Sequence, residues 1–222
     1  MKYLADHPTV QTRLREALVS GFPEAVAKDR LPYAGEIIGP SIPYLDATLE
    51  EILRVAPTAA VGTRQATQDT TLLGSPIPKD TIVLYFSQGP GYFLPSRDID
   101  QSRRSPRSLE DEKTGRIKAW NNDDISLFKP ERWLVKVKAD DSDAEDRVVF
   151  DSQAGPINTF GLGPRSCFGK RLAYVDLKIM LVLLLWNFEL LPCGEGLSSY
   201  GKKLVLTGKP HQCYARLREV RK

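Results

Sequence analysis

The feature that most constrains this fold is a glycine-rich loop that leads directly into a long apolar segment. The loop spans 159–169 and places three glycines around one cysteine, Cys167. Glycine has no Cβ and tolerates positive φ, so the backbone of this loop can approach another group closely. The residues after it are apolar at helical spacing, and nearly all round in the middle, which predicts a buried helix over 167–188. The apolar stripe consists of Leu172, Val175, Ile179, Leu183 and Trp186.

Cys167 stands at the start of this predicted helix, and that position predicts its chemistry. A helix N-terminus carries about half a positive charge and free N–H donors, and both favour the thiolate form of a cysteine. Arg165, two residues earlier, adds a positive charge suited to an anionic ligand. The pattern therefore predicts an anchored thiolate beside an anion clamp, in apolar surroundings.

Few other residues can support metal or redox chemistry. The chain has three cysteines and two histidines, and no C-x-x-C or H-x-x-x-H pair, so a zinc site is not expected. Three cysteines in 222 residues do not make the disulfide framework of a small secreted fold either. A Ser-His-Asp triad would need His7 or His211, next to the two ends of the chain, and neither follows a nucleophile-elbow pattern. We interpret Cys193 and Cys213 as structural.

Composition and charge fit one or two folded domains and exclude other classes of protein. Charged residues make up 27% and hydrophobic residues 41% of the chain, which is ordinary for a folded domain. A net charge of +3 does not describe a nucleic-acid binder, so no nucleic-acid partner is expected. Residues 1–15 mix charged and apolar side chains and do not form a signal peptide. The longest apolar run, Ile179 to Trp186, is far short of the roughly 20 residues that cross a bilayer, so we expect no membrane anchor in this chain.

Two further helices are predicted in the first quarter of the chain. Apolar residues at helical spacing predict a helix over 8–19. A more regular apolar stripe predicts a second helix over 43–56. Ser41 is placed to cap the second helix, and Pro57 is placed to end it, because the residue before a proline avoids the helical region. The stretch 21–40 is rich in proline and glycine and predicts a loop with one helical turn.

The remaining regular structure is predicted to be short strands. Three β-like segments follow the second helix and three follow the apolar helix, at 61–67, 70–73, 81–86, 188–191, 204–206 and 212–217. The stretch 87–122 lacks periodicity and predicts a surface insertion, and the acidic run 139–147 predicts a solvated segment.

The glycine-rich loop resembles the haem-binding loop of cytochromes P450, whose pattern is F-x-x-G-x-R-x-C-x-G. Every fixed position matches, and the matching residues are Phe160, Gly163, Arg165, Cys167 and Gly169. With each residue type at about one in twenty, such a match arises by chance in a chain of this length roughly once in ten thousand. The resemblance implies that Cys167 is the catalytic axial ligand of a haem iron and that the other four residues contact or shape the cofactor site.

Weaker motifs agree with this resemblance, in the order that the family has them. Glu51 and Arg54 form an E-x-x-R pair, which by itself is usually a surface ion pair. The segment 128–133 resembles the P-E-R-F motif of the family, with Trp in place of Phe. By resemblance, its Arg132 joins Glu51 and Arg54 in a buried structural triad. Arg64 lies where the family places a basic residue against a haem propionate.

The resemblance covers nearly the whole chain and implies a fold and a function. The expected fold is mainly α with a small β-sheet (α+β), as one partial P450 domain over 1–222 that lacks the N-terminal half and the oxygen-activating helix. Residues 1–20 would form the helix after that missing element. Asp69-Thr70-Thr71 echoes the oxygen-activating motif, but it lies in a β-like stretch and does not match by position.

By resemblance, the function is that of a haem-thiolate monooxygenase, which inserts one oxygen atom of O2 into an apolar organic substrate. The 87–122 insertion is similar to that of fungal members, which suggests secondary metabolite biosynthesis. The implied cofactor is haem b, with electrons from NADPH through NADPH-cytochrome P450 reductase. A full-length relative is expected at the endoplasmic reticulum membrane, and the chain is otherwise expected to be cytoplasmic.

The sequence leaves two alternatives to a monooxygenase open. The first is a truncated, non-catalytic relic or interaction module, and the second is a redox-sensing protein that uses Cys167. The second needs a resolving cysteine, and Cys193 lies beyond a long helix. The haem assignment in turn requires that Cys167 not point away from every cavity wide enough for a flat macrocycle. Lys129, Lys170 and Arg171 are candidates for a basic surface that meets an acidic reductase, although exposed cations are usually only solvated.

Overall fold

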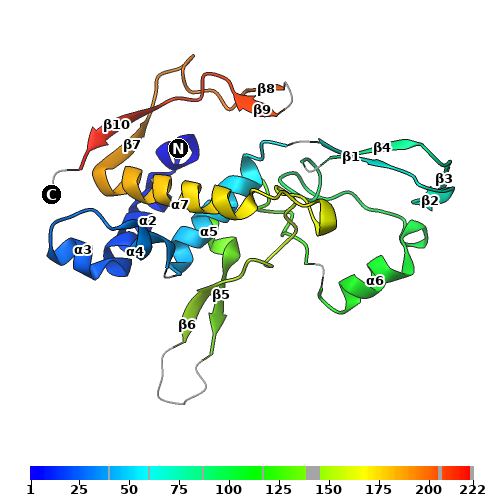
Figure 1. The fold of residues 1–222 in the computed structure, drawn as a ribbon, viewed down its shortest axis with the longest axis horizontal. Helices are drawn as coiled ribbons and strands as arrows, with labels where there is room; N and C mark the ends of the chain where they lie inside the picture. Colours follow the sequence, from blue (N-terminus) through cyan, green and yellow to red (C-terminus); the bar gives the residue numbers. More distant parts are fainter. Residues whose placement is uncertain are drawn as a thin grey trace.

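The computed structural model describes residues 1–39, 41–59, 61–86, 88–116, 118–138, 146–204 and 207–220. Its α-helices other than α6 gather around α5 and α7 (Figure 1). The α-helices are α1 (Lys2–Asp6), α2 (Pro8–Gly21), α3 (Pro23–Ala27), α4 (Ala34–Ile38), α5 (Pro43–Val55), α6 (Pro106–Lys113) and α7 (Lys170–Asn187). Three short 3-10 turns are η1 (Gln101–Arg103), η2 (Pro130–Trp133) and η3 (Gly163–Arg165). None of the described helices has the length and apolar character needed to cross a bilayer.

The described strands form five separate antiparallel pairs, which extend outward from the helices (Figure 1). The pairs are β1 (Val61–Gln65) with β4 (Ile82–Phe86), β2 (Thr70–Leu72) with β3 (Ser75–Ile77), β5 (Leu134–Val137) with β6 (Arg147–Phe150), β7 (Phe188–Pro192) with β10 (Ala215–Glu219), and β8 (Lys202–Leu204) with β9 (Gly208–Pro210). The predicted combination of helices with limited β structure is confirmed. The strands do not, however, join into one sheet.

The main core lies where α1, α2, α4, α5 and α7 meet. Leu14 and Leu18 of α2 are fully buried, as are Leu181 and Leu185 of α7. Each pair is spaced i, i+4, so both members lie on one face of their helix. A smaller second core joins Ala47 of α5 to Trp120, Ile125 and Trp133. Helix α5 thus contributes to both cores.

The two early helices end within two residues of their predicted limits. Helix α5 ends at Val55, before Pro57, for the predicted reason. The predicted cap was wrong, because Ile42 is the N-cap residue, and the Ser41 hydroxyl instead donates to a carboxylate oxygen of Asp46 at 2.8 Å. The predicted loop at 21–40 contains two short helices, α3 and α4.

The start of α7 and the burial of its first half were predicted wrongly. The helix begins at Lys170, three residues after Cys167, with Gly169 as its N-cap residue. Its fully buried residues, Leu181, Val182 and Leu185, all lie in the second half, whereas Leu172 is 65% exposed. An apolar pattern on all sides shows what a helix is able to bury. Within the described chain the second half of α7 is covered more fully than the first, although Met180 is still 55% exposed.

The stretch 87–122 contains a helix that its sequence pattern does not predict. Helix α6 is capped by the Ser105 hydroxyl oxygen, which accepts a hydrogen bond from the Ser108 N–H at 3.2 Å. The helix buries no residue, so it lacks the apolar stripe on which prediction depends. Most of the acidic run, 139–145, and the end of a predicted strand, 205–206, lie outside the described residues.

Candidate functional site

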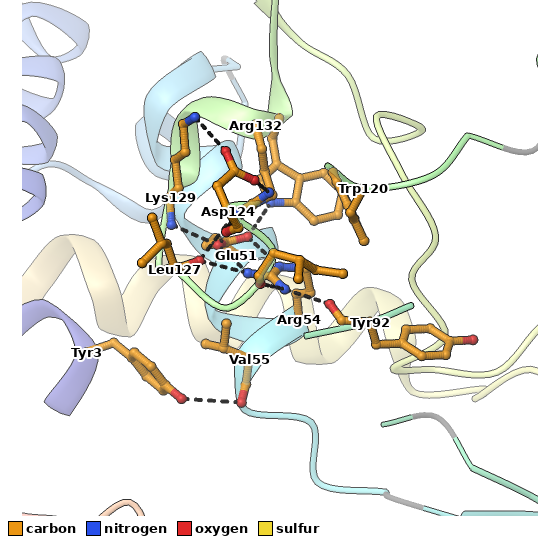
Figure 2. A network of polar contacts seen from close by, with 12 residues as sticks. Tyr3, Glu51, Arg54, Val55, Tyr92, Trp120, Asp124, Leu127, Lys129 and Arg132 are labelled. Carbon is orange, nitrogen blue, oxygen red and sulfur yellow. Dashed lines mark hydrogen bonds and ion pairs between the residues drawn. The ribbon is translucent and has the colours of Figure 1, made fainter. Parts of the chain in front are cut away.

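Glu51 and Arg54 form a buried ion pair on one face of α5 (Figure 2). Their spacing of i, i+3 on the helix brings the two side chains together. The Arg54 Nε and Nη2 atoms donate to the two Glu51 carboxylate oxygens at 2.8 and 2.7 Å, and neither side chain reaches solvent. Arg54 also donates to the backbone carbonyls of Tyr92, Ile125 and Leu127, at 2.6, 2.9 and 3.0 Å. All of the guanidinium nitrogens are therefore used.

Arg132 reaches the same carboxylate from η2, 81 residues later in the chain. Its Nε donates to Glu51 Oε1 at 3.2 Å, and its Nη1 donates to Asp124 Oδ1 at 2.9 Å (Figure 2). The Trp133 indole N–H donates to Glu51 Oε2 at 2.9 Å, and the backbone N–H of Lys129 donates to Oε1 at 2.8 Å. The three residues of the expected triad thus lie in one hydrogen-bonded group.

Asp124 is the member of this group that sequence reasoning missed. It balances the second arginine, so two guanidinium groups face two carboxylates and the buried network is close to neutral. Hydrogen bonds from Lys129 and Arg132 hold the pKa of the Asp124 carboxyl below its usual range. No local motif identifies this residue. A buried network of this kind is costly to break at any one member, because each loss leaves a charge unpaired.

The loop that carries Cys167 closes on itself through its backbone. The Cys167 N–H donates to the Phe160 carbonyl at 2.7 Å, which brings the two ends of the motif together. Gly161 and Gly163 have φ values of 70° and 68°, in the left-handed region that favours glycine. A Cβ atom at Gly169 would lie 3.9 Å from the Cys167 sulfur, directly beside the thiol.

The surface around Cys167 is exposed and carries both apolar and cationic side chains. Cys167 is exposed, Phe168 is fully exposed, and Leu162 is 72% exposed. The Arg165 side chain is also exposed, and within the described chain it has no hydrogen-bond or ion-pair partner. A soft sulfur ligand, exposed apolar side chains and an unpaired cation form a donor set that fits a flat apolar macrocycle with acidic substituents. Cys167 is exposed and lines no enclosed cavity formed by the described residues, so the cavity that the haem assignment requires is not seen in this part of the chain.

Two backbone carbonyls at the end of α5 tie this helix to other parts of the chain. The Thr159 hydroxyl, at the start of the cysteine loop, donates to the Leu53 carbonyl at 3.1 Å. The Tyr3 hydroxyl reaches the Val55 carbonyl at 3.4 Å (Figure 2). The last carbonyls of a helix have no partner within it, so these bonds satisfy groups that would otherwise need water.

Arg64 lies apart from the cysteine loop in its contacts. It is on β1, opposite Val83 of β4, and its side chain is exposed. Its guanidinium group donates to the Thr63 carbonyl at 2.8 Å and lies 5.2 Å from the centre of the Tyr85 ring. Among the described residues, none of these contacts reaches the loop of Cys167.

The other residues that the sequence singled out have ordinary surroundings. The Lys129 ammonium group pairs with Asp124 at 2.7 Å, and that of Lys170 lies 5.7 Å from the centre of the Tyr174 ring. Arg171 is exposed. The described cysteines carry free thiols, and those of Cys193 and Cys213 are half-buried.

Comparisons with known proteins agree with this geometry. A family model described as Cytochrome P450 matches residues 1–91 and 119–214, and the stretch that it leaves out contains α6. The chain is 45% identical over 226 residues to the cytochrome P450 monooxygenase TRI13 of Fusarium sporotrichioides, and 41% identical over 223 residues to xilC of Penicillium crustosum. It is 39% identical over 225 residues to the Hps1-dma1 cluster cytochrome P450 monooxygenase cyp3.1 of Dothistroma septosporum. These matches cover 99%, 99% and 98% of this chain, but only 38%, 36% and 70% of the respective relatives.

Proposed function

The chain belongs to the cytochrome P450 family, and from that membership we propose that it forms the haem-thiolate part of a monooxygenase, with Cys167 as the axial ligand of the iron. The observation that carries the proposal is the loop 160–169. It contains an exposed cysteine, exposed apolar side chains and an arginine that has no partner among the described residues.

Haem b, when bound, would supply the activation of O2, with one oxygen atom entering the substrate and the other leaving as water at the cost of two electrons from NADPH. Cys167 would hold the iron as a thiolate. Arg165 would pair with a propionate, and we propose the same role for Arg64, whose guanidinium group would have to leave Tyr85 to reach it. Phe160, Gly163 and Gly169 would shape the loop. Glu51, Arg54 and Arg132 would brace the helix beneath it.

We further propose a small apolar organic substrate and a role in fungal secondary metabolism. The proposal rests on similarity to three fungal proteins named as monooxygenases, one of them named for a gene cluster. NADPH-cytochrome P450 reductase is the proposed electron donor, and the exposed cations Lys170 and Arg171 are the candidate contacts, because Lys129 is already paired with Asp124. For a full-length relative we propose the endoplasmic reticulum membrane.

The exposed apolar side chains beside Cys167 support a second candidate function. Phe168, Leu162 and Leu172 are each largely exposed, and a contiguous patch of such side chains usually marks an interface with another polypeptide. On this reading the chain is an interaction module or a relic, and it does not oxidise a substrate by itself.

A haem titration distinguishes the two candidates. We expect the purified chain to bind one haem, and its reduced, carbon monoxide-bound form to show the red-shifted Soret band of thiolate ligation. Cys167→Ser should abolish that band, whereas Cys193→Ser, a matched loss of a half-buried thiol, should retain it. A wild-type chain that folds but shows no thiolate band favours the interaction module.

A further inference from the structure

Glu50 is a buried carboxylate with one unused oxygen, next to Glu51 in the sequence but outside its network. Successive residues of a helix point about 100° apart, so Glu50 faces α7 while Glu51 faces η2. The Tyr174 hydroxyl of α7 donates to Glu50 Oε1 at 2.5 Å. Oε2 is buried, and it has no hydrogen-bond partner among the described residues. Burial raises the pKa of the Glu50 carboxyl, and the nearby charges act in opposite directions, since Lys170 lowers this pKa and Asp46 raises it.

Tyr174 links this carboxylate to the cysteine loop. Its ring lies 5.4 Å from that of Phe160, centre to centre, at an interplanar angle of 39°. The Phe160 carbonyl in turn accepts the hydrogen bond from the Cys167 N–H. A continuous series of contacts therefore runs from Glu50 on α5 through Tyr174 and Phe160 to the backbone of Cys167.

We propose that Glu50 and Tyr174 are positioning residues that fix the Phe160 end of the cysteine loop, and with it the thiol, against α5. The loop needs such support, because its outer residues Leu162 and Phe168 are exposed and contribute little packing. Within the described chain, the hydrogen bond from Thr159 to the Leu53 carbonyl ties the start of the loop to α5. A phenol that a carboxylate holds by its oxygen presents one fixed ring face to Phe160, whereas an unheld ring is free to shift. The consequence for haem binding rests on the proposed function, but the placement of the thiol does not.

The reactivity of Cys167 in the haem-free chain tests the placement directly. In a Cys193→Ser, Cys213→Ser background, the second-order rate constant for alkylation by iodoacetamide reports on Cys167 alone. Tyr174→Phe keeps the ring but loses the hydroxyl, and Glu50→Ala loses the acceptor. Both should change the rate constant about fivefold, the factor that one ordinary hydrogen bond contributes. Glu50→Gln keeps an acceptor oxygen and should restore a rate within twofold of the parent.

Tyr200→Phe is a matched control, because the Tyr200 hydroxyl also donates to a carboxylate oxygen at 2.5 Å, on Asp6, away from the cysteine loop. Its alkylation rate should equal that of the parent. The proposal is overturned if Tyr174→Phe and Glu50→Ala alkylate within twofold of the parent, or if Tyr200→Phe changes the rate as much as Tyr174→Phe does. If Glu50→Ala does not fold, the comparison of Tyr174→Phe with Tyr200→Phe decides by the same criterion.

The haem-bound chain provides a second readout. Tyr174→Phe should lower the fraction of the thiolate-type Soret band, and Glu50→Gln should keep it. If the alkylation rates change as expected but the wild-type chain has no thiolate band, the positioning role stands and the proposed function fails. If the band is present and the alkylation rates do not respond, the proposed function stands and the positioning role is wrong.

Discussion

Glu50 and Glu51 have the same side chain and adjacent positions, but their surroundings differ in kind. Glu51 accepts bonds from Arg54, Arg132 and Trp133, so its charge is matched on several sides. Among the described residues, Glu50 accepts a hydrogen bond only from the Tyr174 hydroxyl, and its other oxygen has no partner there. A matched carboxylate stabilises the fold as an anion, whereas burial favours the protonated form of a poorly matched one. We therefore expect neutralisation of Glu51 and of Glu50 to change the free energy of unfolding in opposite directions.

Neutralising Glu51 should destabilise the protein strongly. Glu51→Gln leaves Arg54 and Arg132 buried with one carboxylate fewer, which typically costs about 3–5 kcal/mol. Urea unfolding followed by circular dichroism measures this loss in the free energy of unfolding. Glu24→Gln is the control, since Glu24 is exposed and pairs with Lys28 on the surface, and its loss should stay below about 1 kcal/mol. A Glu51→Gln variant as stable as Glu24→Gln would contradict the buried network.

Replacing Glu50 with Gln should remove a loss of stability that the wild type shows as the pH rises. Its pKa is raised above the ordinary value of 4.5, so between these two values the folded state binds more protons than the unfolded state. The contribution of Glu50 to stability is therefore fully present below pH 4.5 and is lost as the pH rises through the raised pKa. The wild type should lose stability relative to Glu50→Gln over this interval, as measured by urea unfolding at several pH values. Parallel curves for the two proteins would show that the Glu50 carboxyl titrates normally.

At the scale of elements, the two halves of α7 differ in how far they are buried. The second half packs against α2 and α4 and buries Leu181, Val182 and Leu185. The first half follows the cysteine loop and leaves Leu172 largely exposed. The same apolar composition thus contributes to stability in one half and forms part of the candidate haem surface in the other.

Alanine substitutions in the two halves of α7 should have unequal costs. Leu181→Ala leaves a cavity in the main core and should cost about 2–5 kcal/mol of unfolding free energy. Leu172→Ala, a matched change on the same helix, should stay within about 0.5 kcal/mol. Urea midpoints of both variants measure the difference. Equal losses would mean that the first half of α7 is packed as tightly as the second.

On the scale of the whole molecule, α5 is the element that joins the other parts. One face of α5 holds η2 and the segment around Asp124, and another contacts α7 through Glu50. Its last turn receives Thr159 and Tyr3. The strand pairs β1–β4 and β2–β3, by contrast, extend outward and are mostly exposed (Figure 1). Stability is therefore concentrated in the helices, and the open surface around Cys167 is left for a ligand or a partner.

The open apolar surface around Cys167 should make the haem-free chain self-associate. Phe168→Glu places a charge on its most exposed side chain and should weaken association about tenfold, or about 1.4 kcal/mol. Sedimentation velocity over a range of concentrations measures the dissociation constant. Tyr214→Glu adds the same charge to another exposed aromatic residue and should leave association unchanged. Equal effects of the two variants would attribute association to net charge rather than to this surface.

Local patterns in the sequence were enough to predict the cysteine loop and the main helices. The loop motif occupies ten consecutive residues, and two of its three glycines, Gly161 and Gly163, adopt the positive φ values that glycine favours. The limits of α2 and α5 follow from apolar spacing and from prolines next to their ends. In each case the physical cause lies within a few residues of its effect.

Tertiary structure alone decided which residues surround that loop and how much of it is covered. Arg132 meets Glu51 across 81 residues of sequence, and Tyr174 meets Glu50 across 124. No spacing rule connects such positions, because their contact depends on how α5, η2 and α7 pack. The exposure of Leu172 has the same origin, since an apolar helix face is buried only where another part of the chain covers it.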